Sequence, residues 1–271
     1  MTKFAAIQMA SGPQVAANLT EAGRLIGMAA RSGAGLVVLP ENFALMPMRE
    51  EDRVHSAEAN GDGPIQAFLS TQARMHNVSL VGGTIPLRAN DRVRVRAACL
   101  VYDAQGECIG RYDKIHLFDV RLANGEAYEE SRGIEAGSDP VVVSTAFGKM
   151  GLAVCYDLRF PELFRKLLDA GAEFIAVPSA FTAQTGRAHW EPLVRARAIE
   201  NLCYVIAANQ GGYHVNGRET HGDSMIVSSW GDVLDRLPRG SGVVLAEFDA
   251  DYQRRTRTNL PSIEHRRLNH G

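Results

Sequence analysis

The chain has 271 residues, of which 45% are hydrophobic and 22% charged, and its formal net charge is -2. This balance suits a globular protein with a sizeable core and excludes the strongly basic surface that nucleic-acid binding requires. No apolar run approaches the ~18 residues of a membrane-spanning helix.

The N-terminal segment and the cysteines indicate the cellular compartment and bear on metal binding. The apolar run near the N-terminus is too short for a secretory signal and reads as a first strand. Four cysteines lie far apart and form neither a disulfide framework nor a paired metal motif. They are Cys99, Cys108, Cys155 and Cys203. We therefore expect a cytoplasmic protein without a metal or other cofactor and without a membrane or nucleic-acid partner.

The apolar pattern predicts strands and helices that alternate along the chain. Residues 3–9 predict a strand, 18–31 a helix and 36–39 a buried strand, which together form a βαβ unit. Further strands are predicted at 78–85 (broken by two glycines), 93–102, 108–112, 150–154, 174–177, 204–208, 224–227, 233–237 and 243–248, and further helices at 64–75, 161–170, 190–200 and 252–258. We expect one α/β domain over 1–271, with helices on the outer faces of mixed sheets and a polar tail from about residue 260.

One internal similarity bears on the organisation of the chain. Residues 33–40 read GAGLVVLP and residues 171–178 read GAEFIAVP. Each segment follows a predicted helix and enters an apolar strand that stops at proline. Two interpretations stay open. The chain consists of two equivalent halves, or the two segments share a sequence pattern that is common to many βα units.

Three reactive side chains follow predicted strands. Glu41, Lys114 and Cys155 each come directly after, or within two residues of, an apolar strand, and reactive groups in α/β folds gather at the carboxyl ends of strands. A thiol nucleophile, a carboxylate base and a cation that stabilises an oxyanion are what hydrolysis of an amide by a thiol needs. The backbone N–H of Tyr156 is placed to be a second oxyanion donor. Singly, each residue also fits a plain structural role, above all Cys155 as a buried core thiol.

The segments LPENF, YDKIHLFD and GLAVCYDLRFPEL around these residues resemble the three signature segments of the nitrilase superfamily of carbon–nitrogen hydrolases. The resemblance runs over nearly the whole chain, with the three segments in the same order and spacing. It implies a four-layer α-β-β-α sandwich that forms a homodimer through a helical face. It also implies that Glu41 is the general base, that Lys114 supports the tetrahedral intermediate and that Cys155 is the nucleophile.

The resemblance implies a second active-site glutamate shortly after the lysine. Glu130 falls at the matching place, with Glu126 and Glu129 as nearby alternatives. Its implied role is to hold Lys114 and to help proton transfer to the leaving amine.

Later segments, among them PSAF at 178–181 and TGRAHWEPLVRARAIE at 185–200, resemble the branch that contains deaminated-glutathione amidase and omega-amidase. The implied substrate is a small linear 2-oxo acid amide, deaminated glutathione first, with 2-oxoglutaramate and amide transfer by the same residues as alternatives. Arg159 is a candidate for the substrate carboxylate, its alternative being an ion pair with Asp157 or Glu162, and Phe181 is a candidate pocket residue. Arg187 replaces a proline that is usual in the family, and we expect it to add a cation near the pocket rim.

Three further expectations concern the surroundings of Cys155. The N-terminus of the helix predicted from Pro161 would favour a thiolate nearby. His116 and His189 raise the alternative of a Cys–His hydrolase, which the resemblance does not favour. His214 and His221 lack further ligands at metal-binding spacing.

Overall fold

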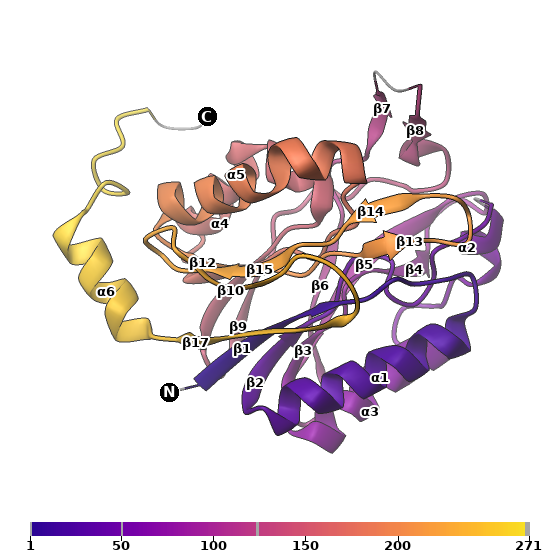
Figure 1. Cartoon of the computed structure of the whole chain (residues 1–271), viewed down its shortest axis with the longest axis horizontal. Coiled ribbons are helices and arrows are strands. Elements are labelled where there is room, and N and C mark those ends of the chain that lie inside the picture. The colour runs from indigo at the N-terminus through magenta and orange to yellow at the C-terminus, as the bar shows by residue number, and fades with distance from the viewer. Residues whose placement is uncertain (1, 50, 123–124, 269–271) are drawn as a thin grey trace.

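Two β-sheets lie face to face and helices cover both outer faces, which gives four α-β-β-α layers (Figure 1). The computed structural model describes residues 2–49, 51–122 and 125–268. The last three residues of the expected polar tail lie outside these ranges. The fold class predicted from the sequence is confirmed.

The first sheet has the strand order β17-β1-β2-β3-β5-β4, and β6 also pairs with β5. Its strands are β1 (Thr2–Gln8), β2 (Ala34–Val38), β3 (Ser79–Val81), β4 (Ile85–Arg88), β5 (Val95–Tyr102), β6 (Cys108–Asp113) and β17 (Gly242–Phe248). Strands β1, β2 and β3 are parallel, whereas β5 is antiparallel to both β3 and β6. Strands β2 and β6 therefore run in the same direction and end at the same edge of the sheet.

The second sheet has the strand order β16-β15-β12-β11-β10-β9. Its strands are β9 (Val142–Thr145), β10 (Gly148–Leu152), β11 (Phe174–Ala176), β12 (Tyr204–Ala207), β15 (Ser224–Val227) and β16 (Val233–Leu237). Strands β10, β11 and β12 are parallel, as β1, β2 and β3 are in the first sheet.

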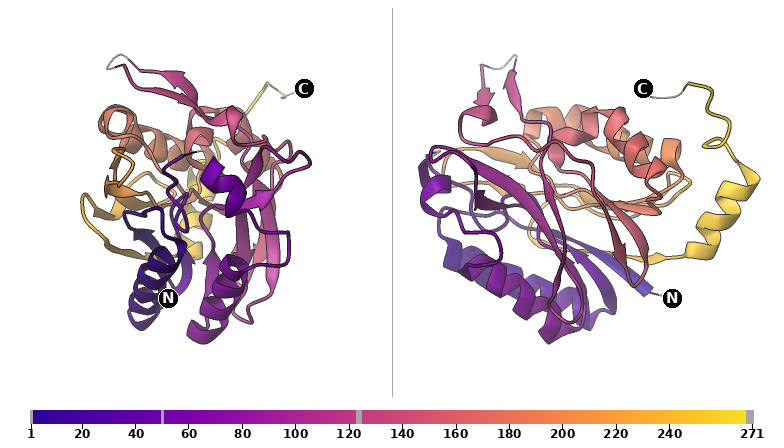
Figure 2. Two further views of the ribbon diagram at one scale, coloured as in Figure 1. Left: turned by 90° about the vertical axis from the view of Figure 1, so that its right-hand side faces the viewer. Right: turned by 180° about the vertical axis from the view of Figure 1, so that it is seen from behind.

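Helices α1 (Val15–Arg31) and α3 (Pro64–His76) cover the first sheet, and α4 (Pro161–Asp169) and α5 (Ala183–Asn201) cover the second. Figure 2 shows the same layers from the side and from behind. The short helix α2 (Glu51–His55) lies in the loop region between β2 and α3, and α6 (Ala250–Asn259) extends past the end of the sandwich.

Alternating side chains of one strand contribute to two different cores. Phe4 and Ala6 of β1 point into the core between the sheets, whereas Ala5 and Ile7 point into the core under α1 and α3. Because both faces of the strand are buried, its sequence reads as a continuous apolar run instead of an alternating one.

The clearest difference from the predicted elements is the start of α5. The sequence predicted a helix over 190–200, but α5 begins at Ala183, after Thr182, whose hydroxyl accepts the N–H of Thr185 at 3.3 Å. Gly186, which disfavours a helix interior, lies in the first turns that were not predicted. The expected strand over 78–85 is two strands, β3 and β4, separated at its two glycines.

Short elements in the long loops were not predicted. They are the hairpins β7 (Asp119–Arg121) with β8 (Ala127–Glu129) and β13 (Gly211–Tyr213) with β14 (Glu219–His221), and the 3-10 helices η1 (Glu130–Arg132) and η2 (Cys155–Arg159). Together with α2 they surround the edge at which β2 and β6 end, and this edge holds the candidate site.

Candidate active site

Cys155 sits on a sharp turn between a buried strand and a 3-10 helix. Strand β10 ends at Leu152, and η2 begins at Cys155 itself. The residue has φ +50°, a left-handed conformation that strains a side chain other than glycine. Its N–H donates to the carbonyl of Pro178 at 2.9 Å, which fixes the turn against the segment after β11. Such a turn projects a nucleophile out of the sheet edge.

The N–H of Tyr156 lies in the first turn of η2, where amides have no acceptor within the helix. Among the described residues this amide has no backbone hydrogen-bond partner. It is therefore available to an oxygen bound beside the cysteine.

Lys114 is held by two carboxylates from different elements. Its ammonium donates to Glu41 Oε1 at 2.8 Å and to both carboxylate oxygens of Glu130 at 2.9 Å. Glu41 follows β2, Lys114 follows β6, and Glu130 opens η1, so three loops meet at this point. The N–H of Phe118 fixes Glu130 further by donating to Oε2 at 2.6 Å.

The charges of this cluster set its protonation. Burial raises the pKa of the Cys155 thiol well above its ordinary value, Glu41 raises it further, and Lys114 with a backbone hydrogen bond from Ala180 opposes the rise. Burial alone would lower the pKa of Lys114, but Glu130 and Glu41 outweigh it and raise that pKa. At neutral pH the thiol and the ammonium therefore both keep their protons, and a carboxylate is left as the group that can accept the thiol proton.

Helix α4 begins at Pro161, as the sequence predicts, and η2 lies between it and Cys155. That the N-terminus of α4 favours a thiolate stays a prediction. The largest effect on the pKa of Cys155, which is 7% exposed, is burial, and it raises that pKa.

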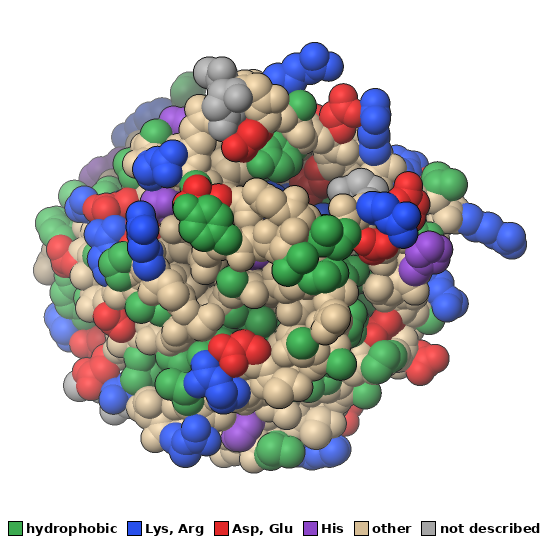
Figure 3. All heavy atoms as spheres, turned by 45° about the vertical axis from the view of Figure 1, so that its right-hand side comes forward, with side chains coloured by type: hydrophobic (Ala, Val, Ile, Leu, Met, Phe, Trp, Pro, Cys, Tyr) green, Lys and Arg blue, Asp and Glu red, His purple; other side chains and the backbone are tan. Residues whose placement is uncertain are grey.

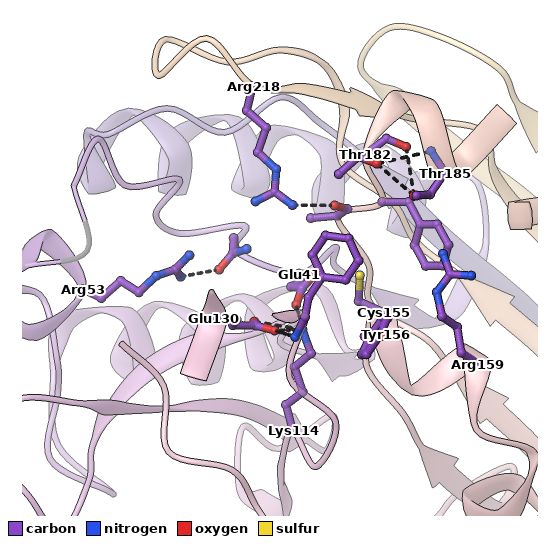
Figure 4. A pocket seen from close by; sticks show the side chains of 14 residues that line it. Glu41, Arg53, Lys114, Glu130, Cys155, Tyr156, Arg159, Thr182, Thr185 and Arg218 are labelled. Atoms are coloured by element: carbon purple, nitrogen blue, oxygen red, sulfur yellow. Dashed lines mark hydrogen bonds and ion pairs between the residues drawn. The ribbon is translucent and has the colours of Figure 1, made fainter. Parts of the chain in front are cut away.

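The side chains of Glu41, Lys114, Glu130 and Cys155 open onto one cavity with an empty volume of about 550 Å³, open solvent at its mouth included. Figure 4 shows Glu41, Lys114, Glu130 and Cys155 around it. Its remaining lining residues are Asn42, Arg53, Phe118, Tyr156, Arg159, Ala180, Phe181, Thr182, Thr185 and Arg218.

Arg159 and Phe181, both singled out from the sequence, lie on the cavity wall. The guanidinium of Arg159 is over the rings of Tyr156 and Phe181, at 5.7 Å and 5.5 Å from their centroids, and Nη1 lies 3.2 Å from His189 Nδ1. Within the described residues Arg159 forms no ion pair with Asp157 or Glu162. The alternative that Arg159 serves only such an ion pair is therefore wrong. Its charge faces the cavity.

Asp157 is the buried support of the turn. Its carboxylate, 0% exposed, accepts the Tyr112 hydroxyl at 2.7 Å, the Val154 N–H at 2.7 Å and the His116 N–H at 3.1 Å, and it lies 2.6 Å from His116 Nδ1. These bonds tie η2, β6 and the segment after Lys114 together directly behind Cys155.

The histidines stand apart from the cavity. His116 stacks on Phe160 at 3.7 Å between ring centroids, and neither His116 nor His189 lines the cavity, so the Cys–His alternative has no geometric support. His214 is bonded to Ser11 and Thr220. Over the described ranges no group of three or more His, Cys, Asp or Glu could hold a metal ion.

Arg187 is not at the rim of this cavity. It lines a separate hollow beside α5 and β14, together with His221 and Arg236. The resemblance suggested the rim, but Thr185, two residues earlier, is the side chain that lines the cavity. Residues two apart on a helix point to different sides, so Arg187 lies on another face of α5.

Sequence reasoning missed Arg53, Phe118, Thr182, Thr185 and Arg218, which also line the cavity. They come from α2, from the loop before β7, from the start of α5 and from the turn between β13 and β14. None of these segments has the strand-end signal that identified the other residues.

The model of the carbon-nitrogen hydrolase family matches residues 3–258. The chain is a carbon–nitrogen hydrolase. This enzyme is 42% identical over 265 residues to the deaminated glutathione amidase of Synechocystis sp., covering 97% of both chains. It is 39% identical to the human protein of that name, over 97% of this chain and 81% of the human one.

Solved structures agree with the fold of this hydrolase. The C. elegans NitFhit protein superimposes with a TM-score of 0.91 at 35% identity, over 98% of this chain, and the present chain spans only 65% of its length. Nit3 of Saccharomyces cerevisiae, a member of branch 10 of the nitrilase superfamily, gives a TM-score of 0.87 at 30% identity over 96% of this chain and 94% of that one. In the described part of the hydrolase, no helix is long and apolar enough to cross a membrane.

Proposed function

We propose that this hydrolase cleaves a small linear 2-oxo acid amide, and that the amide is deaminated glutathione. The observation that carries the proposal is the single cavity in which Cys155 faces Glu41, Lys114 and Glu130 beneath three arginines. Such a cavity suits an anionic amide, and relatives that are 37–42% identical carry the name deaminated glutathione amidase.

The proposed reaction has two halves. The carboxylate of Glu41 accepts the thiol proton as Cys155 Sγ attacks the amide carbon, and the ammonium of Lys114 with the Tyr156 N–H stabilises the oxyanion. The C–N bond then breaks, the proton goes to the leaving amine, and the acyl group stays on sulfur as a thioester. Water, deprotonated by the same carboxylate, attacks the thioester and releases the acid and the thiol.

Glu130 is proposed to position Lys114. Both oxygens of its carboxylate accept hydrogen bonds from the Lys114 ammonium, and one of them also accepts the Phe118 N–H. A cation fixed in this way needs little rearrangement when charge develops on the substrate oxygen.

The decisive test of the substrate is kinetics on two 2-oxo acid amides. We expect kcat/KM for deaminated glutathione to exceed that for 2-oxoglutaramate. A preference for 2-oxoglutaramate would mean an omega-amidase instead. Hydroxylamine as a competing acceptor separates hydrolysis from transfer, because a transferase would yield the hydroxamate in place of the free acid.

The oligomeric state and the cellular location of the enzyme are also proposals. We propose a homodimer that uses the outer face of α5, where Ile199 is exposed on the helix and Trp230 on the turn next to it. The bond from Arg195 Nε to the Gly231 carbonyl, 2.9 Å, joins the helix to this turn. We propose the cytoplasm as its location, because the four cysteines are free thiols.

A further inference from the structure

Arg218 reaches the cavity from a loop that the catalytic cluster does not use. It lies in the turn between β13 and β14, and its Nη2 donates to the carbonyl of Ala180 at 3.1 Å. Its Nε is buried without a hydrogen-bond partner among the described residues. A buried guanidinium N–H without an acceptor is costly, so this side chain is set to receive an acceptor that the protein itself does not supply.

Two of the arginines lie on opposite sides of the nucleophile. In Figure 4 the sulfur of Cys155 lies between Arg159 on one side and Arg218 on the other. Arg218 also holds the backbone of Ala180, which is the residue that hydrogen-bonds the thiol. A substrate whose amide carbon sits at the sulfur can therefore extend toward a cation in both directions.

The cavity continues outward past Arg218. A neighbouring hollow shares Arg53 and Arg218 with the catalytic cavity and is also lined by Met46, Pro47, Tyr128, Tyr213 and Asn216. Glu126 and Glu219 also line this hollow. An anion there is therefore drawn toward Arg53 and Arg218, which the hollow shares with the catalytic cavity, and away from the two carboxylates.

On the basis of the proposed function, we propose that Arg218 binds the carboxylate at the far end of the leaving amine, while Arg159 serves the carboxylate of the 2-oxo acyl part. Deaminated glutathione has both groups, since its amide joins a 2-oxo diacid to cysteinylglycine. 2-Oxoglutaramate has only the first, because its leaving group is ammonia. Arg218 is thus the residue that selects a long, twice-anionic amide over a short one.

The test uses three substrates, namely deaminated glutathione, its analogue with the glycine carboxylate converted to an amide, and 2-oxoglutaramate. For Arg218→Gln we expect kcat/KM to fall about 10- to 100-fold on deaminated glutathione, as loss of a charge-assisted bond predicts. The two substrates without that carboxylate should lose less, because only the lost bond to the Ala180 carbonyl affects them. Arg187→Gln, which removes the same charge from the separate hollow beside α5 and β14, should leave all three rates unchanged.

Two comparisons guard against a merely structural effect. In the wild-type enzyme the amide-capped analogue should react about 10- to 100-fold more slowly than deaminated glutathione, and Arg218→Lys should regain part of the loss. An equal loss on all three substrates, or an unchanged preference, would overturn the role of Arg218. If the wild-type enzyme does not cleave deaminated glutathione at all, it is the proposed function that fails.

Discussion

At the scale of single residues, the reactivity of Cys155 is set by a balance of neighbours. The buried thiol is kept protonated, and Glu41 both raises its pKa and is the proposed acceptor of its proton. A thiol of this kind is a weak nucleophile until the base takes its proton during attack. Cys99 and Cys203 are 0% exposed and neither lines the catalytic cavity. Arg257 donates to the sulfur of Cys203 at 3.1 Å.

Glu41→Gln should separate these two effects of the carboxylate. Without the negative charge the pKa of Cys155 should fall, because Lys114 then opposes burial alone, and the pH profile of iodoacetamide alkylation should move to lower pH. Hydrolysis should nevertheless drop about 10²- to 10⁴-fold, as loss of a general base predicts. The alkylation profile and kcat/KM are measured on the same preparations. An alkylation profile that moves to higher pH would contradict this assignment of charges.

At the scale of elements, the turn from β10 into η2 is kept in place by Asp157. Cys155 has a strained backbone, and such strain persists only where the surroundings over-determine the conformation. Asp157 provides this constraint through its bonds to Tyr112, Val154 and His116.

Asp157→Asn should weaken both stability and catalysis. The amide nitrogen of asparagine cannot accept the hydrogen bonds that the second carboxylate oxygen accepts, so we expect a loss of about 1–3 kcal/mol in the free energy of unfolding and a lower kcat. Denaturant unfolding and steady-state kinetics measure the two quantities. Asp169→Asn at the exposed end of α4 is the matched control, expected to stay within about 0.5 kcal/mol. Equal stabilities of the two variants would argue against Asp157 as the support.

The loop that carries Glu41 depends on a glycine from a different strand connection. Gly83 has φ +55°, and a Cβ there would overlap the carbonyl oxygen of Pro40, the residue before Glu41. The backbone after β3 therefore packs directly against the segment that positions the proposed base.

Gly83→Ala should displace this segment and lower kcat/KM along with stability. Gly61→Ala is the control, because Gly61 also has positive φ (+85°) but has nothing within 4 Å of the added Cβ. It should cost only about 1 kcal/mol of backbone strain and leave kcat/KM unchanged. A Gly83→Ala enzyme with normal kcat/KM would show that Pro40 and Glu41 tolerate the shift.

At the scale of the whole molecule, two similar halves form the sandwich. The order β1-α1-β2-α3-β3 in the first sheet matches β10-α4-β11-α5-β12 in the second. The similar segments 33–40 and 171–178 lie at β2 and β11, the central strand of each parallel group. The two similar sequence segments thus occupy equivalent positions in the two sheets.

Periodicity predicted mixed sheets with helices on their outer faces, and strand ends predicted the positions of Glu41, Lys114 and Cys155, because buried parallel strands leave a strong apolar signal. The four-layer sandwich was predicted from the resemblance to the nitrilase superfamily. The outer wall of the cavity could not be predicted in this way. Arg53 lies in the short helix α2, Thr182 just before α5 and Arg218 in a turn. These segments are too short or irregular to leave a periodic signal, and the fold brings them together at the cavity. Arg187, which the resemblance placed near the pocket rim, instead lines a separate hollow.

The surface of the sandwich bears on its assembly. Figure 3 shows acidic and basic side chains interspersed on one face of the molecule. Next to α5, however, Ile199, Trp230 and Leu234 are 45%, 55% and 44% exposed, and exposed apolar side chains close together are typical of an interface.

Light scattering should give a dimer of about 59 kDa, twice the 29.5 kDa of one chain. Ile199→Asp should shift the protein toward the monomer, because it buries a charge in the apolar contact. Met75→Asp, at an exposed position on α3, should leave the dimer intact. A monomeric wild-type enzyme would contradict the proposed assembly.

The most direct test of the account is the rate at which Cys155→Ala hydrolyses deaminated glutathione, measured as release of the 2-oxo acid. The variant should keep the fold, checked by thermal unfolding, because only one sulfur is lost. We expect kcat to fall at least about 10³-fold, as it does when a nucleophile is removed elsewhere. Hydrolysis within tenfold of the wild-type rate would show that the thiol of Cys155 does not attack the amide.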